Sequence, residues 1–304
     1  MVCAHTEDRW EAISAGIDAL ARQDPAPGQV VLVIDHNPAL LERARAAFAD
    51  VLVVGNAHER GLAGARNTGI EHATGDVIAF LDDDARPRPG WLAGFLDAFA
   101  RPEVQGTGGL IVPDWLTARP AWFPEEFLWV VGCTYAGAPT DERPIRNPIG
   151  ASMAFRREAF DRAGAFTSGH GRVGLRPTGN CEETELAIRV RGALPGAVIL
   201  QVPGSVIDHE VTAARTTFAY FVDRCWNEGK SKAQLTRETG TATGLESERA
   251  YTTRILPRGV LRGLRDTLSG DAGGLRRSAV IVIGFLATGA GYAAGSLAAR
   301  LARD

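Results

Sequence analysis

Three consecutive carboxylates follow an apolar run in the first third of the chain. Residues 77–81 are all apolar, and Asp82, Asp83 and Asp84 come directly after them. We expect the run to cross a sheet and to present the carboxylates at its carboxyl edge, where ligands of α/β proteins gather. Hard divalent cations take oxygen ligands and leave positions for substrate phosphates. The pattern therefore predicts a cation and phosphate site, with a solvated acidic turn as the alternative, because Asp is common at turns.

The elements before these carboxylates alternate between strand and helix. From apolar runs and caps we expect strands at 1–4, 30–34 and 51–54, and helices at 6–20 and 38–49. Such alternation predicts a mostly parallel sheet with right-handed crossovers and helices on its faces. Asp35, which follows the second strand, then falls at the same edge as the acidic residues.

A glycine-rich segment, 61–69, separates the third strand from the acidic residues. We expect it to be a loop that enters a helix ending near His72. Glycines let the backbone approach a ligand closely, and a helix start offers free amide groups to an anion. Tight packing is the alternative. After the acidic residues, 86–91 is expected to leave the sheet before a helix at 92–99.

Further acidic residues and a histidine occur in the second half of the chain. A strand leading into a short helix is expected at 147–157, followed by a turn at 164–166 and a helix that starts with Glu182 and Glu183. Glutamates in a first turn suit the helix dipole, so plain capping is an alternative. His209 follows an expected short strand at 198–202, and a structural hydrogen-bonding role is its alternative.

The order of Asp35, the glycine-rich segment and the acidic cluster resembles family-two glycosyltransferases of the A-type fold, over about residues 1–230. The resemblance implies a nucleotide-sugar site made by Ala4, His5, Thr6, Asp35, Arg66, Asp82 and Asp83. It also implies a Mg²⁺ or Mn²⁺ site made by Asp82, Asp84 and His209. His36 and Asn37, which follow Asp35, depart from the family pattern. The nucleotide base of the donor is therefore left open, although a UDP-sugar is favoured.

The resemblance also implies an inverting transfer with Glu183 as general base, where the family more often has Asp. An acceptor hydroxyl must lose a proton as it attacks the anomeric carbon, and such assistance contributes about 10²- to 10⁴-fold. Five further residues are weaker candidates for diphosphate or acceptor contacts: Glu182, Arg224, Lys230, Trp122 and Trp129. For the tryptophans, a local packing cluster is the favoured alternative.

Composition restricts the classes of partner. The chain of 304 residues is 45% hydrophobic and 23% charged, with a formal net charge of -3, so nothing in it favours nucleic acid. The four cysteines have no paired metal-ligand spacing. Isolated thiols of this kind are typical of packing in a reducing compartment.

The carboxyl-terminal part differs in character. Residues 231–277 read as a basic helical linker, and 278–299 carry no charge. About 20 apolar residues can span a bilayer, so 278–299 is a candidate transmembrane or interfacial helix. A buried helix pair is the alternative. The Gly291-x-x-x-Gly295 spacing would allow close helix contact, and the basic residues before the segment favour the cytoplasmic face of a membrane.

The sequence therefore predicts an α/β protein: a single A-type glycosyltransferase domain with a mixed, mostly parallel sheet, plus a carboxyl-terminal membrane-associated helix. Residues 1–110 would bind the donor, and 111–230 would bind a lipid-linked or glycan acceptor. One alternative is a catalytically inert nucleotide-binding scaffold of the same fold. A phosphatase of the haloacid dehalogenase type is less favoured, because Arg86 stands where that family has Thr or Val.

Overall fold

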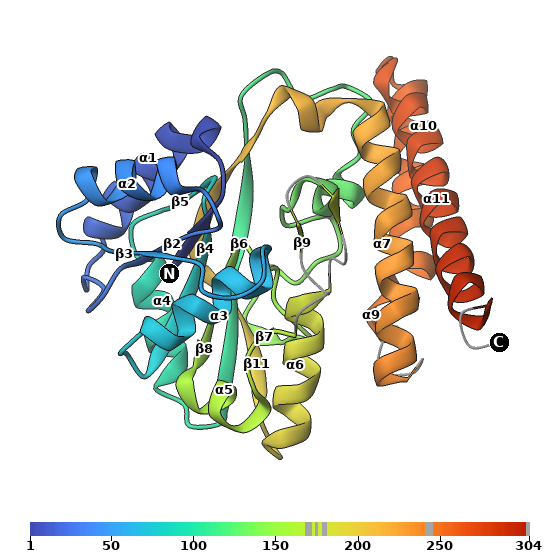
Figure 1. Ribbon diagram of the computed structural model, residues 1–304. Helices are drawn as coiled ribbons and strands as arrows, with labels where there is room; N and C mark the ends of the chain where they lie inside the picture. Colours follow the sequence, from blue (N-terminus) through green and yellow to red (C-terminus); the bar gives the residue numbers. More distant parts are fainter. Residues whose placement is uncertain (168–171, 174–175, 178–180, 241–245, 302–304) are drawn as a thin grey trace. The chain divides into compact units, whose positions relative to one another are not determined.

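The computed structural model describes residues 1–167, 172–173, 176–177, 181–240 and 246–301. Two compact units make up the chain. The first unit comprises residues 1–112, 139–178 and 182–210, and the second comprises 113–138, 179–181 and 211–304. Figure 1 shows the elements of both. The units are treated one at a time below.

The first unit is organised around a sheet. Among the described residues, nine strands join it, in the order β3-β2-β1-β4-β8-β6-β11-β5 with β7 beside β11. The strands are β1 Val2–Ala4, β2 Val31–Ile34, β3 Leu52–Gly55, β4 Val77–Asp82, β5 Ala85–Pro87, β6 Val104–Trp115, β7 Arg143–Pro144, β8 Ser152–Arg156 and β11 Val198–Val211. Strands β9 Arg172–Val173 and β10 Arg176–Pro177 form a separate pair.

The first four strands in sequence are parallel, and helices connect them. The pairs β3-β2, β2-β1 and β1-β4 are all parallel, whereas β8 is antiparallel to both β4 and β6. The helices are α1 Trp10–Ala21, α2 Pro38–Ala47, α3 Leu62–His72, α4 Trp91–Phe99, α5 Arg157–Ala163 and α6 Glu182–Ala193. A short 3₁₀ turn, η1 Glu7–Arg9, precedes α1. The predicted mixed α/β architecture is confirmed.

Alternation along β8 shows how helices cover both faces of the sheet. Met153 and Phe155 join a core cluster with apolar residues of β4, α3, α5 and α6. Ser152, the neighbour of Met153, points to the opposite face, because successive strand residues alternate. There its hydroxyl accepts a hydrogen bond of 2.9 Å from the indole of Trp91 in α4. The carboxyl edge of the sheet is thus held between two packed layers.

The expected helix ends at His72 as predicted, but it begins earlier than expected, so most of the glycine-rich segment is helix and the loop before it is shorter. Helix α3 begins at Leu62, so only Gly61, with φ 134°, has the backbone of a loop. A side chain at Gly64 would overlap the carbonyl oxygen of Glu59, and one at Gly69 would overlap the side chain of Met1. These two glycines therefore allow close packing of α3, the alternative considered for this segment.

Two expected breaks in the sheet are strands. Ala85–Pro87 forms β5, which pairs antiparallel with β11, and β11 continues from Val198 to Val211 instead of ending at 202. Ser205, Ile207, His209 and Val211 are buried while their neighbours are more exposed. This two-residue periodicity, which continues beyond Pro203 and Gly204, is the local reason for the longer strand.

The second unit is helical. Its elements are η2 Glu125–Val131, η3 Ala213–Thr216, α7 Phe218–Thr239, α9 Glu246–Ala250, η4 Tyr251–Ile255, α10 Leu256–Leu268 and α11 Gly273–Leu301. Figure 1 shows α7, α10 and α11 side by side. Aromatic rings of 115–129 pack on one another and on Phe221 of α7, for example Phe127 and Phe123. The packing alternative for this aromatic segment therefore matches the structure.

Candidate active site and metal centre

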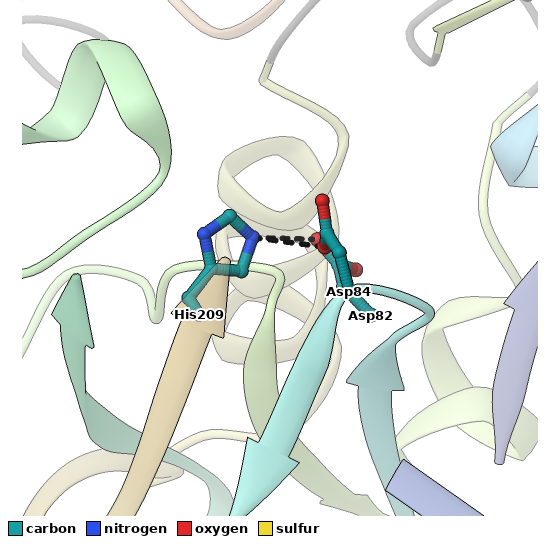
Figure 2. Close-up of side chains that lie close together, drawn as sticks. All are labelled: Asp82, Asp84 and His209. Atoms are coloured by element: carbon teal, nitrogen blue, oxygen red, sulfur yellow. Dashed lines mark ion pairs between the residues drawn. The ribbon is translucent and has the colours of Figure 1, made fainter. Parts of the chain in front are cut away.

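Strands β4 and β11 bring two carboxylates and an imidazole together. His209 lies opposite Ala85 in the β5–β11 register, beside the end of the acidic cluster. Its Nε2 atom is 3.1 Å from Oδ1 of Asp84 and 3.9 Å from Oδ2 of Asp82. Figure 2 shows the imidazole of His209 directed at both carboxylates. His209 and Asp84 are buried, whereas 32% of the Asp82 side chain is exposed.

These three side chains fit a divalent cation. Each offers a ligand atom, and the atoms lie within 4.8 Å of one another. Oxygen ligands suit Mg²⁺ and Mn²⁺, and imidazole nitrogen is compatible with transition metals, so the mixed donor set suits a cation such as Mn²⁺. Exposure of Asp82 leaves one side of the group open to a ligand. A divalent cation is therefore supported at this edge of the sheet.

Asp83 and Asp84 share a basic partner, Arg9 of η1. The Arg9 guanidinium bonds to Oδ1 of Asp83 and lies 3.3 Å from Oδ2 of Asp84. Burial would lower the pKa of Arg9, but Asp83 and Asp84 outweigh burial and hold that pKa above its ordinary value. Burial raises the pKa of Asp83 to about 7, with Arg9 opposing the rise and the neighbouring carboxylates adding to it. One guanidinium does not fully compensate three adjacent carboxylates.

Arg66 joins the acidic cluster to the start of α6. Its buried guanidinium forms an ion pair with Glu182, lies 3.6 Å from Asp82, and donates 3.1 Å to the carbonyl of Gly150. Burial opposes the charge of Arg66, yet Glu182, Asp82 and Glu183 contribute to holding its pKa above the ordinary value. Arg66 therefore links the two acidic segments predicted to carry the chemistry.

Glu183 follows Glu182 in the first turn of α6 and is half-buried. It is close enough to Arg66 to act on that guanidinium electrostatically. Its role as general base, drawn from the resemblance, stays a prediction.

Asp35 follows β2 directly and is oriented by hydrogen bonds. Its carboxylate accepts hydrogen bonds from Asn56 Nδ2 at 2.7 Å and from the amide of Gly61 at 2.9 Å. It also lies 2.9 Å from Nδ1 of His36, a residue with φ 52°. Asp35 is thus oriented by the loop before α3, and its contact with a nucleotide stays a prediction.

The end of β1 lies next to Asp35. The amide of Asp35 donates to the carbonyl of Ala4 at 2.7 Å, and Asn37 donates to the carbonyl of His5 at 3.2 Å. The hydroxyl of Thr6 caps η1 by accepting from the amide of Asp8. These three predicted nucleotide residues therefore occupy the same sheet edge as Asp35.

The remaining weak candidates belong to the second unit. Arg224 is buried and donates to the carbonyl of Val130 at 3.4 Å, Trp122 packs on Phe221, and the indole of Trp129 donates to the Tyr251 hydroxyl at 3.0 Å. Lys230 is exposed on α7. Contacts of these residues with diphosphate or acceptor stay predictions.

Sequence reasoning missed two polar residues of the site, Arg9 and Asn56. The Asn56 carboxamide bonds to Asp35, to the carbonyl of Glu59, to the amide of His58 and to the hydroxyl of Thr68. Asn56 follows β3 directly, so the rule applied to Asp35, a polar residue after a parallel strand, would have found it. Arg9 has no comparable local signal.

Solved structures with the same fold include two transferases. A mannosyltransferase from Pyrobaculum calidifontis in complex with GDP-Man and Mn²⁺ has a TM-score of 0.57 and 19% identity, covering 94% of this chain and 86% of that one. GalNAc-T7 with UDP, GalNAc and Mn²⁺ has a TM-score of 0.53 and 18% identity, covering 79% of this chain and 50% of that one. Because both identities are below 25%, these similarities show a shared fold and nothing about the substrate.

Sequence comparison is more specific. A glucosyl-dolichyl phosphate glucuronosyltransferase of Haloferax volcanii is 32% identical over 236 residues, which cover 76% of this chain and 75% of the relative. The model of glycosyl transferase family 2 matches residues 1–164, more than half of the chain. With the Asp82, Asp84 and His209 group in place at the sheet edge, these matches establish that the chain is a glycosyltransferase and belongs to family 2.

Proposed function

We propose that this protein transfers a sugar from a nucleotide-sugar, with a UDP-sugar favoured, to a lipid-linked acceptor or a cell-envelope glycan. The reaction inverts the anomeric configuration and takes place at the cytoplasmic face of the membrane. The relative from Haloferax volcanii, named for action on a dolichyl phosphate-linked sugar, supports a lipid-linked acceptor. It also supports a hexosyl or glycuronosyl group as the one transferred.

One observation carries the proposal: Asp82, Arg66 and Glu182 form a continuous charged chain from the candidate cation site to the start of α6. Transfer needs a site for the leaving diphosphate and a base for the acceptor, held in fixed geometry. These ion pairs connect the residues proposed to bind the diphosphate with the start of α6, where Glu183 is the proposed base. A scaffold without activity has no need of this connection.

In the proposed step, the acceptor hydroxyl oxygen attacks the anomeric carbon while the bond from that carbon to the diphosphate oxygen breaks. The proton of the hydroxyl passes to the carboxylate of Glu183, and the nucleoside diphosphate leaves. Ala4, His5, Thr6 and Asp35 would hold the nucleoside. When a divalent cation is bound at the Asp82, Asp84 and His209 group, it stabilises negative charge on the diphosphate.

Calorimetric titration of UDP and GDP into the purified protein, with and without Mn²⁺, tests the proposal. We expect one nucleotide to bind in a Mn²⁺-dependent manner and the binding to be lost in Asp84→Ala. Asp76→Ala is the matched control, because Asp76 is exposed at the other end of β4. Binding that survives Asp84→Ala, or a folded protein that binds neither nucleotide in Mn²⁺, would contradict the proposed donor site.

A further inference from the structure

Helix α11 is long and apolar enough over Gly273–Ala298 to span a membrane, and only 22% of its apolar 18-residue window is buried. Length and composition alone do not distinguish a helix that crosses the bilayer from one that lies on it. The partners of α11 within the second unit do distinguish the two.

Helix α7 packs along α11 through small residues. Side chains at Gly229 or Gly291 would overlap the backbone of the facing helix, at Thr288 and Trp226 respectively. Arg237 of α7 also donates to the carbonyl of Gly295 at 3.1 Å. The Gly291-x-x-x-Gly295 spacing is therefore used inside one chain, against α7.

A helix of α7's composition is unsuited to the bilayer interior. Within 22 residues it carries seven charged residues: Asp223, Arg224, Glu228, Lys230, Lys232, Arg237 and Glu238. Charged side chains inside a bilayer are costly and rare. If α11 crossed the membrane with α7 attached, these charges would lie at the depth of the hydrocarbon.

The face of α11 turned away from α7 is apolar. Val282, Ile283 and Leu286 are exposed to 46%, 38% and 61%. A helix on a protein that meets only water has a polar outer face. The exposed side of α11 therefore has the chemistry of a surface that contacts lipid.

Helix α10 adds a second apolar stripe. Leu261, Leu264 and Leu268 are exposed to 54%, 40% and 89%, and their spacing places them on one face. The helices α10 and α11 are antiparallel, with Gly263 against Gly274 and Gly259 near Ile281. Because each residue turns the helix by about 100°, this contact directs the leucines of α10 to the same side as the exposed face of α11.

Basic side chains flank the leucine stripe. Arg254, Arg258 and Arg265 share the neighbouring face of the chain segment 251–268, and Arg276 is exposed at the start of α11. Within the described part of the chain, no ion pair involves these four guanidinium groups. Arginines next to an apolar stripe match the anionic headgroups above an acyl layer.

We propose that this docking face, formed by Leu261, Leu264, Leu268, Val282, Ile283 and Leu286, binds an anionic lipid bilayer in the plane of the membrane. The apolar side chains enter the acyl boundary and the four arginines contact lipid phosphates. Helix α11 then lies on the membrane and does not cross it. This inference uses only the second unit and does not depend on the donor or the acceptor.

Sedimentation of the full chain with vesicles tests the docking face. We expect stronger binding to phosphatidylcholine mixed with phosphatidylglycerol than to phosphatidylcholine alone, and weaker binding as salt rises. Leu264→Gln should reduce partitioning about tenfold or more, and Arg258→Gln about fivefold. The controls Leu96→Gln and Arg22→Gln change exposed residues of the first unit and should leave partitioning unchanged.

Cysteines placed on either side of the apolar part of α11 decide whether this helix lies on the membrane or crosses it. In Ser269→Cys and Ala298→Cys, added to the outside of sealed vesicles, an impermeant thiol reagent should label both positions, with the unchanged chain as blank. Protection of one position alone would mean a crossing helix and overturn the proposal.

Equal partitioning of Leu264→Gln and Leu96→Gln into vesicles would also overturn it. Loss of self-association in Leu264→Gln would then assign the docking face to a second copy of the chain. Calorimetry of UDP, GDP and Mn²⁺ on the same variants keeps failure of the docking face separate from failure of the donor site.

Discussion

In the first unit, ionisable side chains such as Asp84, Arg66 and Glu182 are buried at the carboxyl edge of the sheet. In the second, large apolar side chains such as Leu268 and Leu286 lie on the surface. Buried charges are costly unless paired, and exposed apolar faces mark a partner. In each unit, therefore, the residues proposed to act are those that depart from the usual pattern of buried apolar and exposed charged side chains.

The largest effect is expected for the proposed base. Glu183→Gln removes the proton acceptor and should reduce the rate of sugar transfer about 10²- to 10⁴-fold, while Mn²⁺-dependent nucleotide binding stays unchanged. Transfer is measured as nucleoside diphosphate release that depends on acceptor. Glu158→Gln, in the first turn of the neighbouring helix α5, is the matched control. Full transfer activity in Glu183→Gln would remove Glu183 from the proposed step.

Breaking the buried ion pair should destabilise the first unit next most strongly. Arg66→Met leaves Glu182 and Asp82 without their basic partner, and loss of one member of a buried pair costs about 3–5 kcal/mol. Urea unfolding measures this cost. The double variant Arg66→Met with Glu182→Met should recover part of the stability, because no uncompensated carboxylate stays at position 182. A double variant as unstable as the sum of both singles would mean that the pair is not coupled.

In the second unit, adding one methyl group at a helix contact should lower the stability by a smaller amount. Gly291→Ala places a methyl group against the backbone of Trp226 and should cost about 1–3 kcal/mol by overpacking. Gly289→Ala, two residues away in open space, should instead stabilise the helix by about 0.5–1 kcal/mol. Thermal unfolding of the two variants compares them directly. Equal shifts would mean that α7 and α11 do not pack as described.

The smallest change is expected at two thiols, one in each unit. Burial raises the pKa of Cys3 and of Cys225 to about 12, from an ordinary value of 9.0. Both should therefore stay protonated and react slowly with iodoacetamide near neutral pH, since the thiolate is the reactive form. Because the pKa is raised on folding, this contribution to stability is present below pH 9 and is lost as pH rises toward 12. Mass spectrometry of the labelled native protein checks the rate.

Much of the fold was predictable because its signals are local. Apolar runs and caps gave the parallel strands and their helices, and Asp35 and Asp82 were placed at the sheet edge by the rule that strands of one direction end together. Local signals misled where packing overrode them. The glycines of 61–69 suggested a longer loop before the helix, yet Gly64 and Gly69 lie inside α3 and allow close contact.

The sequence by itself indicated the family, the fold class and the acidic strand end, because each is encoded by short local motifs and by their order along the chain. Only the tertiary structure decided which distant residues meet. Arg9 of η1 reaches Asp83, 74 residues away, and Arg66 of α3 reaches Glu182 of α6, 116 residues away. Such pairings depend on strand register and helix contacts across the whole unit, and no local pattern encodes them.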